Sequence, residues 1–245
     1  MPRQDFDLEA LARYLHVSPA QVQKLAERGH VPGRKISGQW KFSRAEIHHW
    51  LEERIGAADD KDLRDVEHVL ERAAEGQTEN PETAGRIDEQ LAVEAIALPL
   101  VARTRSSVIK AMVDLAAGTG HLWDAETMAV AVKERENLHP TALENGVALL
   151  HPRRPLSQIL AQPLLALGIT QQGIPFGESG GQLTDVFFLL CSTDDAGHLK
   201  TLARLSRLIG TAGFLTALRS APDPRAARDV VEKYEDELEN QTPVR

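Results

Sequence analysis

The stretch ENGVALLHPRRP (residues 144–155) places a histidine, His151, at the end of a short apolar run and follows it with a turn that carries two arginines. The apolar run is short and uninterrupted, which predicts a buried strand. A histidine that directly follows such a strand lies at the rim of a sheet. We therefore expect His151 to be exposed there, and we consider it a candidate for chemistry.

A second histidine, His198, stands near the start of a helix predicted over residues 197–210. Backbone N–H groups and the helix dipole favour an anion at such a position. Arg135 comes near the end of a helix predicted over residues 124–138, shortly before the loop that leads to His151. The two histidines are therefore candidates to surround a phosphoryl group.

The carboxyl-terminal part of the chain alternates strand-like apolar runs with helical patterns. Helices interleaved with apolar strands are typical of an α/β sandwich, here with a mixed sheet flanked by helices. Strands are expected within residues 97–102, 146–150, 164–170 and 185–192, and helices within residues 106–120, 124–138, 197–210, 211–220 and after Pro224.

The amino-terminal 55 residues predict a small α+β winged helix-turn-helix domain, so the chain is expected to have more than one domain. Apolar residues at helical spacing predict a helix over residues 8–15, and Ser18 with Gln21 predicts a capping box at the start of a second helix. A hairpin is expected to turn at residues 37–38, and a third helix to cover residues 44–54.

Polar and basic side chains make this amino-terminal domain a candidate to bind double-stranded DNA. In a winged helix-turn-helix, the second helix contacts base edges and the hairpin reaches phosphates. The residues expected at base edges are Gln21, Lys24 and Arg28, and those expected at phosphates are Arg34, Lys35, Lys41 and Arg44. The alternative is a helical module whose basic residues are ordinary solvated surface.

A helical seam and a polar linker separate the two domains. Residues 61–75 space their apolar side chains as a helix does, and a helix of this length needs a partner, which a second copy of the chain would supply in a homodimer. Residues 76–85 contain Pro81 and two glycines and predict a flexible linker. We therefore divide the chain into residues 1–55 (the head), 56–88 (the connector) and 89–240 (the body).

Charge and cysteine content exclude several classes of protein. The chain has 28 basic and 36 acidic side chains, of which residues 1–54 hold nine and seven, so the head is mildly basic and the rest is acidic. This balance argues against a chain that coats nucleic acid or membrane along its length. A single cysteine, Cys191, allows no disulfide framework, which favours a reducing compartment. No apolar run is long enough to span a membrane. We therefore expect a cytoplasmic protein with no metal or other cofactor.

The head resembles the excisionase and MerR-type winged helix-turn-helix family, through LARYLHVSPAQVQKLAERGHVPGRKI and WKFSRAEIHHWL. The body resembles the EIIA domain of the phosphoenolpyruvate-dependent sugar phosphotransferase system, in its fructose, mannitol and nitrogen-regulatory branch. The segments that carry this second resemblance are GVALLH, KERE, HLKTLARLSRL and GIPFGESGGQLTDVFFLL.

The second resemblance implies roles for three residues. His151 occupies the place of the histidine that accepts phosphate from a histidine phosphocarrier protein. His198 would stabilise the phosphoryl group, and Arg135 would orient the site. The protein would then be a DNA-binding regulator that senses the state of the phosphotransferase system. The alternative is a phosphocarrier component that passes phosphate from His151 to a sugar permease.

The sequence departs from the family pattern around His151. Leu150 stands where the family has proline, Pro152 follows the histidine, and Leu143 with Glu144 replaces the usual Ile-Gly of the loop. Glu144 is expected to add a negative charge near a site that must admit phosphate. Retained phosphorylation of His151 and a degenerate domain that serves only as an interaction module are both open on this pattern.

Overall fold

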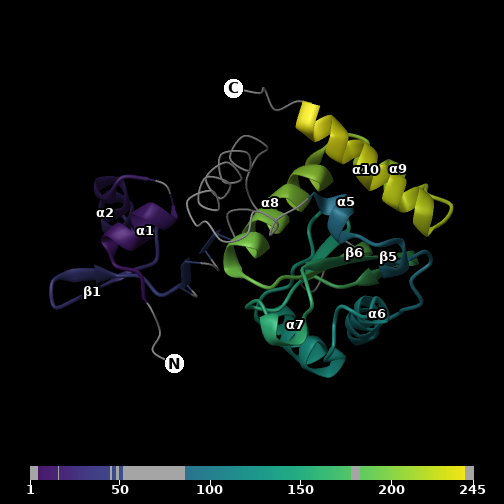
Figure 1. Cartoon of the computed structure of the whole chain (residues 1–245), viewed down its shortest axis with the longest axis horizontal. Coiled ribbons are helices and arrows are strands. Elements are labelled where there is room, and N and C mark those ends of the chain that lie inside the picture. The colour runs from purple at the N-terminus through teal and green to yellow at the C-terminus, as the bar shows by residue number, and fades with distance from the viewer. Residues whose placement is uncertain are drawn as a thin grey trace. The chain divides into compact units, whose positions relative to one another are not determined.

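The computed structural model describes residues 5–15, 17–44, 46–47, 50–51, 86–177 and 183–240 (Figure 1). The chain forms two compact units, the first of Met1–Glu82 with Leu202–Ser206 and the second of Thr83–Thr201 with Arg207–Arg245. The predicted connector helix and linker, and with them the predicted dimer seam, lie outside the described residues.

Two capped helices open the head. Helix α1 (Leu8–Tyr14) is capped by Asp7, whose side chain accepts from Ala10 N. Helix α2 (Pro19–Glu27) begins with the predicted capping box, in which the Ser18 hydroxyl and the Gln21 amide oxygen each accept a backbone N–H from the other residue. Because these caps satisfy donors that a helix end leaves without partners, they set where both helices start.

A short hairpin follows the two helices. Strands β1 (Arg34–Ile36) and β2 (Gln39–Lys41) pair in antiparallel fashion, and Ser37 and Gly38 both have positive φ at the turn, as a type I′ turn requires. Phe6 and Phe42 exchange backbone hydrogen bonds of 2.8 and 2.9 Å, which tie the start of the head to the end of the hairpin.

The predicted third helix of the head is helical at each of its described positions, residues 44, 46–47 and 50–51. Ile47 and Leu51 are buried there, as are Leu11, Val22 and Phe42 elsewhere in the head. The head therefore has an apolar core of its own.

A four-stranded mixed sheet, in the order β3-β5-β6-β4, forms the centre of the body. Strands β5 (Leu164–Pro175) and β6 (Leu183–Cys191) form an antiparallel pair. Strand β3 (Ile96–Ala97) runs parallel to β5, and β4 (Val147–Leu150) runs parallel to β6. The predicted strand over residues 97–102 is wrong beyond Ala97, since Pro99, which has no N–H to donate to a sheet, follows it at once.

Helices cover both faces of this sheet (Figure 1). Helices α6 (Arg105–Gly118) and α7 (Ala125–Leu138) lie on one face, and α8 (Asp195–Gly210) and α10 (Pro224–Asn240) lie on the other. Short segments complete the body: α5 (Ile87–Gln90), α9 (Phe214–Arg219) and the 3₁₀ turns η1 (Val93–Ala95) and η2 (Ser157–Ile159). The predicted α/β sandwich with a mixed sheet is thereby confirmed.

Alternate residues of each strand enter separate layers of the core. Ala148 and Leu150 of β4 join Phe187 and Leu189 of β6 in the layer beneath α6 and α7. The intervening residues, such as Leu149, are buried on the opposite face. Each fully buried large apolar side chain stabilises the fold by roughly 1.5–3 kcal/mol.

Arg219 fixes the start of β4. Its Nε and Nη2 donate to the two oxygens of Asp185 at 2.8 and 2.7 Å, and Nη2 also donates to the Asn145 carbonyl at 2.8 Å. Gly146 has φ +82°, and a Cβ there would lie 2.9 Å from Arg219 Nη2. The positive φ therefore favours glycine at the start of the GVALL run, and a larger residue would also displace the Arg219 guanidinium from its present position.

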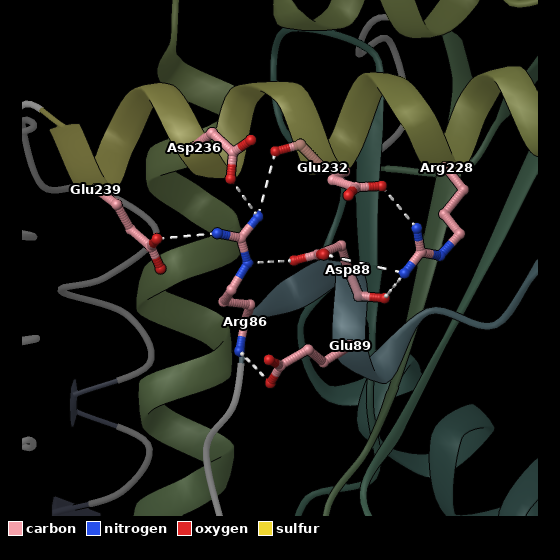
Figure 2. Close-up of polar contacts among 7 residues, drawn as sticks. All are labelled: Arg86, Asp88, Glu89, Arg228, Glu232, Asp236 and Glu239. Atoms are coloured by element: carbon pink, nitrogen blue, oxygen red, sulfur yellow. Dashed lines mark hydrogen bonds and ion pairs between the residues drawn. The ribbon is translucent and has the colours of Figure 1, made fainter.

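A second arginine, Arg86, ties the start of the described body to its last helix, α10 (Figure 2). Its guanidinium contacts Asp88 at 2.8 Å, Asp236 at 2.7 Å and Glu239 at 2.9 Å. Its backbone N–H donates to Glu89 at 3.2 Å. The hydrogen bond to Asp88 raises the pKa of Arg86 above its ordinary value despite the opposing effect of burial, so Arg86 keeps its charge.

Arg228 supports the same cluster from α10. It donates to Glu232 at 2.9 Å and to the Asp88 carbonyl at 3.2 Å, and it lies 3.9 Å from the Asp88 carboxylate. Asp88, whose side chain is only 8% exposed, therefore lies between two arginines. A buried carboxylate of this kind is costly if its partners are removed.

Replacement of Arg86 by alanine should lower the free energy of unfolding of the body by about 1–3 kcal/mol, because it leaves the buried Asp88 with a single, more distant cation. Urea unfolding followed by circular dichroism measures the change. Lys110→Ala is the control, since Lys110 pairs with Asp114 on an exposed face of α6 and should leave the midpoint unchanged. Equal midpoints for the two variants would contradict the role given to Arg86.

Candidate functional site

The candidate site lies where two parallel strands end. Strands β4 and β6 pair in register from Val147 opposite Val186 to Leu150 opposite Leu189. His151 directly follows β4, and Ser192 directly follows β6. Carboxyl ends of strands in open α/β sheets are where ligands usually bind.

The two predicted histidines meet at this edge. The ring centroids of His151 and His198 are 5.1 Å apart, with the planes inclined at 51°. The two residues are only 2% and 3% exposed. The expectation that His151 is exposed at the rim is therefore wrong, because His198 packs on the ring and Pro152, itself buried, follows it.

A backbone carbonyl determines which nitrogen of His151 can react. Nδ1 of His151 lies 2.8 Å from the Leu149 carbonyl oxygen. A carbonyl only accepts, so Nδ1 carries the proton of the neutral ring, and the lone pair is on Nε2. Nε2 is therefore the nucleophilic atom of His151.

His198 is held by the start of α8 and by a hydroxyl. Asp194 caps this helix, accepting from Gly197 N at 2.8 Å, and its carbonyl accepts from His198 N at 3.1 Å. Nδ1 of His198 lies 3.2 Å from Ser192 Oγ. Ser192 is a site residue that the sequence did not single out, since one serine after a strand forms no recognisable motif.

Arg135 lies in the last turn of α7, just before the connection that leads into β4. It is 8% exposed, and its Nη1 donates to the His139 carbonyl at 2.7 Å, at the end of α7. The chain then pairs with β4, through Leu149 N to the Thr141 carbonyl at 3.3 Å and Leu143 N to the Val147 carbonyl at 2.7 Å. Arg135 thus binds the start of the connection that pairs with β4.

Glu136, the next residue, holds this connection in place. Its buried carboxylate accepts from the Thr141 backbone N–H at 3.2 Å and from the Thr141 hydroxyl, and it pairs with Arg105 Nη2 at 3.1 Å. Arg105 belongs to α6, 31 residues earlier in the chain. Sequence patterns could not have revealed this contact, because it depends on how two helices pack.

Glu144 is not near the histidines. It is exposed in the turn before β4, whereas His151 follows the strand, and the four residues of β4 alone span roughly 13 Å. The expected negative charge beside the site is therefore absent at this position. Arg153 and Arg154, by contrast, are exposed directly after His151 and Pro152.

The predicted DNA-contact residues of the head differ in how they are presented. Lys24 and Arg28 are exposed on and just after α2, whereas the amide oxygen of Gln21 is engaged with Ser18. A capping glutamine keeps only its NH₂ group for a base edge. Gln21 can therefore donate hydrogen bonds to a base, but its amide oxygen is not available to accept one.

The wing hairpin has two different faces. Arg34 and Lys41 are directly opposite each other in the register and share one face. Lys35 lies on the other face with Trp40, its Nζ 5.1 Å from the ring centroid. Arg34 also pairs with Asp5 at 3.3 Å, and Arg44 lies over the Phe6 ring at 4.6 Å. The predicted phosphate contacts therefore do not form a single surface.

The body is an α/β sandwich in which a buried pair of histidines lies where β4 and β6 end. The family described as "Phosphoenolpyruvate-dependent sugar phosphotransferase system, EIIA 2" matches residues 89–234. A helix-turn-helix domain matches residues 6–55. The chain therefore belongs to the EIIA type 2 family of the phosphotransferase system, and it carries a helix-turn-helix domain ahead of that domain.

Curated relatives cover the body. A nitrogen regulatory protein of Bradyrhizobium diazoefficiens is 33% identical over 149 residues, which are 59% of this chain and 94% of the relative. The fructose-specific EIIABC component of Bacillus subtilis is 27% identical over 152 residues, which are 61% of this chain but only 24% of the component. The chain thus spans about a quarter of the length of that component.

Solved structures share the fold of the body. The nitrogen regulatory protein IIA-Ntr of Neisseria meningitidis superposes with a TM-score of 0.53 at 20% identity, covering 59% of this chain and 98% of that one. IIA mannitol of Escherichia coli gives 0.51 at 17% identity, covering 57% and 97%. At these identities the likeness concerns the fold alone.

Among the described residues, no helix combines the length and apolar character needed to span a membrane.

Cys191, the residue before Ser192, offers a test of how closed this edge is. Burial raises the pKa of its thiol to about 12, and the residue is 1% exposed. At about pH 8 roughly one thiol in 10⁴ would be ionised, against about a quarter for an ordinary cysteine. The native protein should therefore react with a thiol reagent far more slowly than the urea-unfolded protein, and equal rates would show that the edge is open.

Proposed function

We propose that this protein is a cytoplasmic DNA-binding transcriptional regulator whose body senses the phosphotransferase system through phosphorylation of His151. The observation that carries the proposal is the close pair of His151 and His198, with the His151 lone pair on Nε2, in a chain that also carries a helix-turn-helix domain. The phosphoryl donor is a histidine phosphocarrier protein.

The transfer step exchanges one P–N bond for another. The Nε2 lone pair of His151 forms a bond to phosphorus as the P–N bond of the donor histidine breaks, and the electron pair of that bond returns to the donor ring. Donor and acceptor are both imidazoles, so the protein's task is to align the nitrogens and to stabilise charge on a metaphosphate-like transition state. His198 donates to the phosphoryl oxygens, and Arg135 orients the strand that carries the nucleophile.

Burial of the histidine pair places a condition on this step. With His151 only 2% exposed, Nε2 must be uncovered before a donor can reach it. The turn after Pro152 is the segment that we expect to move, and its exposed Arg153 and Arg154 attract the phosphoryl group. A slow, gated transfer suits a sensor better than a carrier of high flux.

Phosphorylation would act on the head through charge. A phosphate adds about two negative charges at neutral pH, close to Asp194 and Asp195 at the start of α8. The head binds DNA with basic residues such as Lys24 and Arg28, whereas the rest of the chain is acidic. We propose that the added charge changes the affinity of the head for its operator.

The name of the Bacillus relative, a fructose-specific component, supports a second candidate function. In that case the body would pass phosphate from His151 to a sugar permease, and the head would only tether the protein. Onward transfer of phosphate to a sugar, measured with membranes, would favour this carrier over the regulator.

Phosphate transfer is the first prediction of the proposal. The protein incubated with phosphoenolpyruvate, enzyme I and the phosphocarrier of the same cell should gain one acid-labile phosphoryl group by intact mass. His151→Ala should abolish the gain, and His121→Ala, which removes a histidine from the loop between α6 and α7, should preserve it. No labelling, where a known EIIA domain is labelled, would leave the body as an interaction module.

Coupling to DNA is the second prediction. After an operator is selected from random duplexes, phosphorylated and unphosphorylated protein should differ in affinity by at least about fivefold in fluorescence anisotropy. His151→Ala, treated with the same mixture, should show no change, and Lys24→Ala should weaken binding in both states. Equal affinity of the two states for the operator would rule out the regulator.

A further inference from the structure

Ser192 is a polar residue of the site with no role in the function as proposed so far. We propose that Ser192 is a positioning residue: its hydroxyl holds His198 in the tautomer that donates from Nε2 to the phosphoryl group on His151. The inference rests on the proposed phosphorylation of His151 for its purpose, although the tautomer itself exists in the unphosphorylated protein.

Ser192 and His198 are held by two rigid elements. Ser192 follows Cys191, the last residue of β6, and is 5% exposed. His198 is in the first turn of α8, 3% exposed, and the two atoms Oγ and Nδ1 are 3.2 Å apart. Since only Thr193 and Asp194 lie between Ser192 and the first residue of α8, the pair cannot separate without a shift of the helix or the strand.

The direction of this hydrogen bond follows from burial. A buried hydroxyl proton needs an acceptor. Within the part of the chain that the structure describes, the Ser192 hydroxyl has one hydrogen-bond partner, His198 Nδ1. The O–H therefore donates to Nδ1, which leaves the proton of the neutral His198 ring on Nε2.

The opposite arrangement applies to His151. There the Leu149 carbonyl accepts from Nδ1 and leaves the lone pair on Nε2. The pair consequently has one ring that attacks phosphorus and one ring that donates to its oxygens. With the ring centroids 5.1 Å apart, a phosphoryl group on one ring is within reach of the other. The reverse tautomer of His198 would direct a lone pair at negative oxygens, which is repulsive.

Helix capping does not account for the serine. Asp194 already caps α8 through its bond to Gly197 N at 2.8 Å. The hydroxyl is therefore not required for the helix to begin, and its contact with the imidazole has its effect on the tautomer.

The test compares three variants of the full-length protein. Ser192→Ala removes the hydroxyl, and Ser192→Thr keeps it. Thr201→Val is the matched control, because it removes a buried hydroxyl from the same helix, three residues after His198, where the partner is Gln90 at 3.3 Å. Nitrogen NMR at about pH 8, where an ordinary imidazole is neutral, reports the tautomer of each histidine.

The wild-type protein, Thr201→Val and Ser192→Thr should show His198 protonated on Nε2, and Ser192→Ala should show a mixture of tautomers. Labelling of His151 by the phosphocarrier should be about tenfold slower in Ser192→Ala, with kcat affected more than KM, and Ser192→Thr should restore it. A His198 tautomer unchanged in Ser192→Ala, or a rate equal to that of the wild type, would overturn the inference.

Failure of the proposed function and failure of the role of Ser192 would give different results. If the wild-type protein accepts no phosphate, the proposed function fails, and the NMR comparison still decides whether Ser192 sets the tautomer. If the wild type is labelled and Ser192→Ala is labelled equally fast, the function stands and the role of Ser192 falls. The role of Ser192 would also fall if labelling of His151 were as slow in Thr201→Val as in Ser192→Ala, because loss of any buried hydroxyl would then explain the effect.

Discussion

The parallel pairing of β4 with β6 is the constraint on which the rest of the body depends. It brings the ends of two strands that are distant in sequence to one edge, where His151 and Ser192 then lie beside the start of α8. The pairing is held from within by apolar layers on both faces and from the start of β4 by the contact of Arg219 with Asp185. Because neighbouring side chains of β4 enter opposite layers, a one-residue slip would remove the histidine from its partner.

Much of this arrangement could be predicted from the sequence, and what could not has physical reasons. The apolar runs and caps indicated the strands, the helices and both domains, and the place of His198 near the start of a predicted helix made it a candidate beside His151. The burial of both rings could not be inferred, since it depends on how α8 packs on the strand ends. Ser192 and Arg105 escaped notice because a single serine or arginine acquires meaning only from a neighbour that the fold supplies. The charge of Glu144 was misplaced because a sequence pattern does not say which end of a strand faces the site.

The head shows how one basic segment can have two functions. In the hairpin, Arg34 and Lys41 face one side while Lys35 packs on Trp40 on the other. Lys35 lies over the half-buried Trp40 and Arg44 over the buried Phe6, so part of the positive charge packs against aromatic rings within the head. A count of basic residues therefore overestimates the surface available to a phosphate backbone, and Gln21, which caps its own helix, is a similar case.

The cluster around Arg86 has an architectural consequence. It joins the beginning of the described body to Glu239, near the end of the last helix, across 2.9 Å (Figure 2). A domain whose two chain ends meet at one point can be spliced into a longer polypeptide, or placed behind a new partner, without disturbing its interior. The salt bridges of Arg86 hold the beginning of the described body against its last helix, which is the arrangement that such a splice would use.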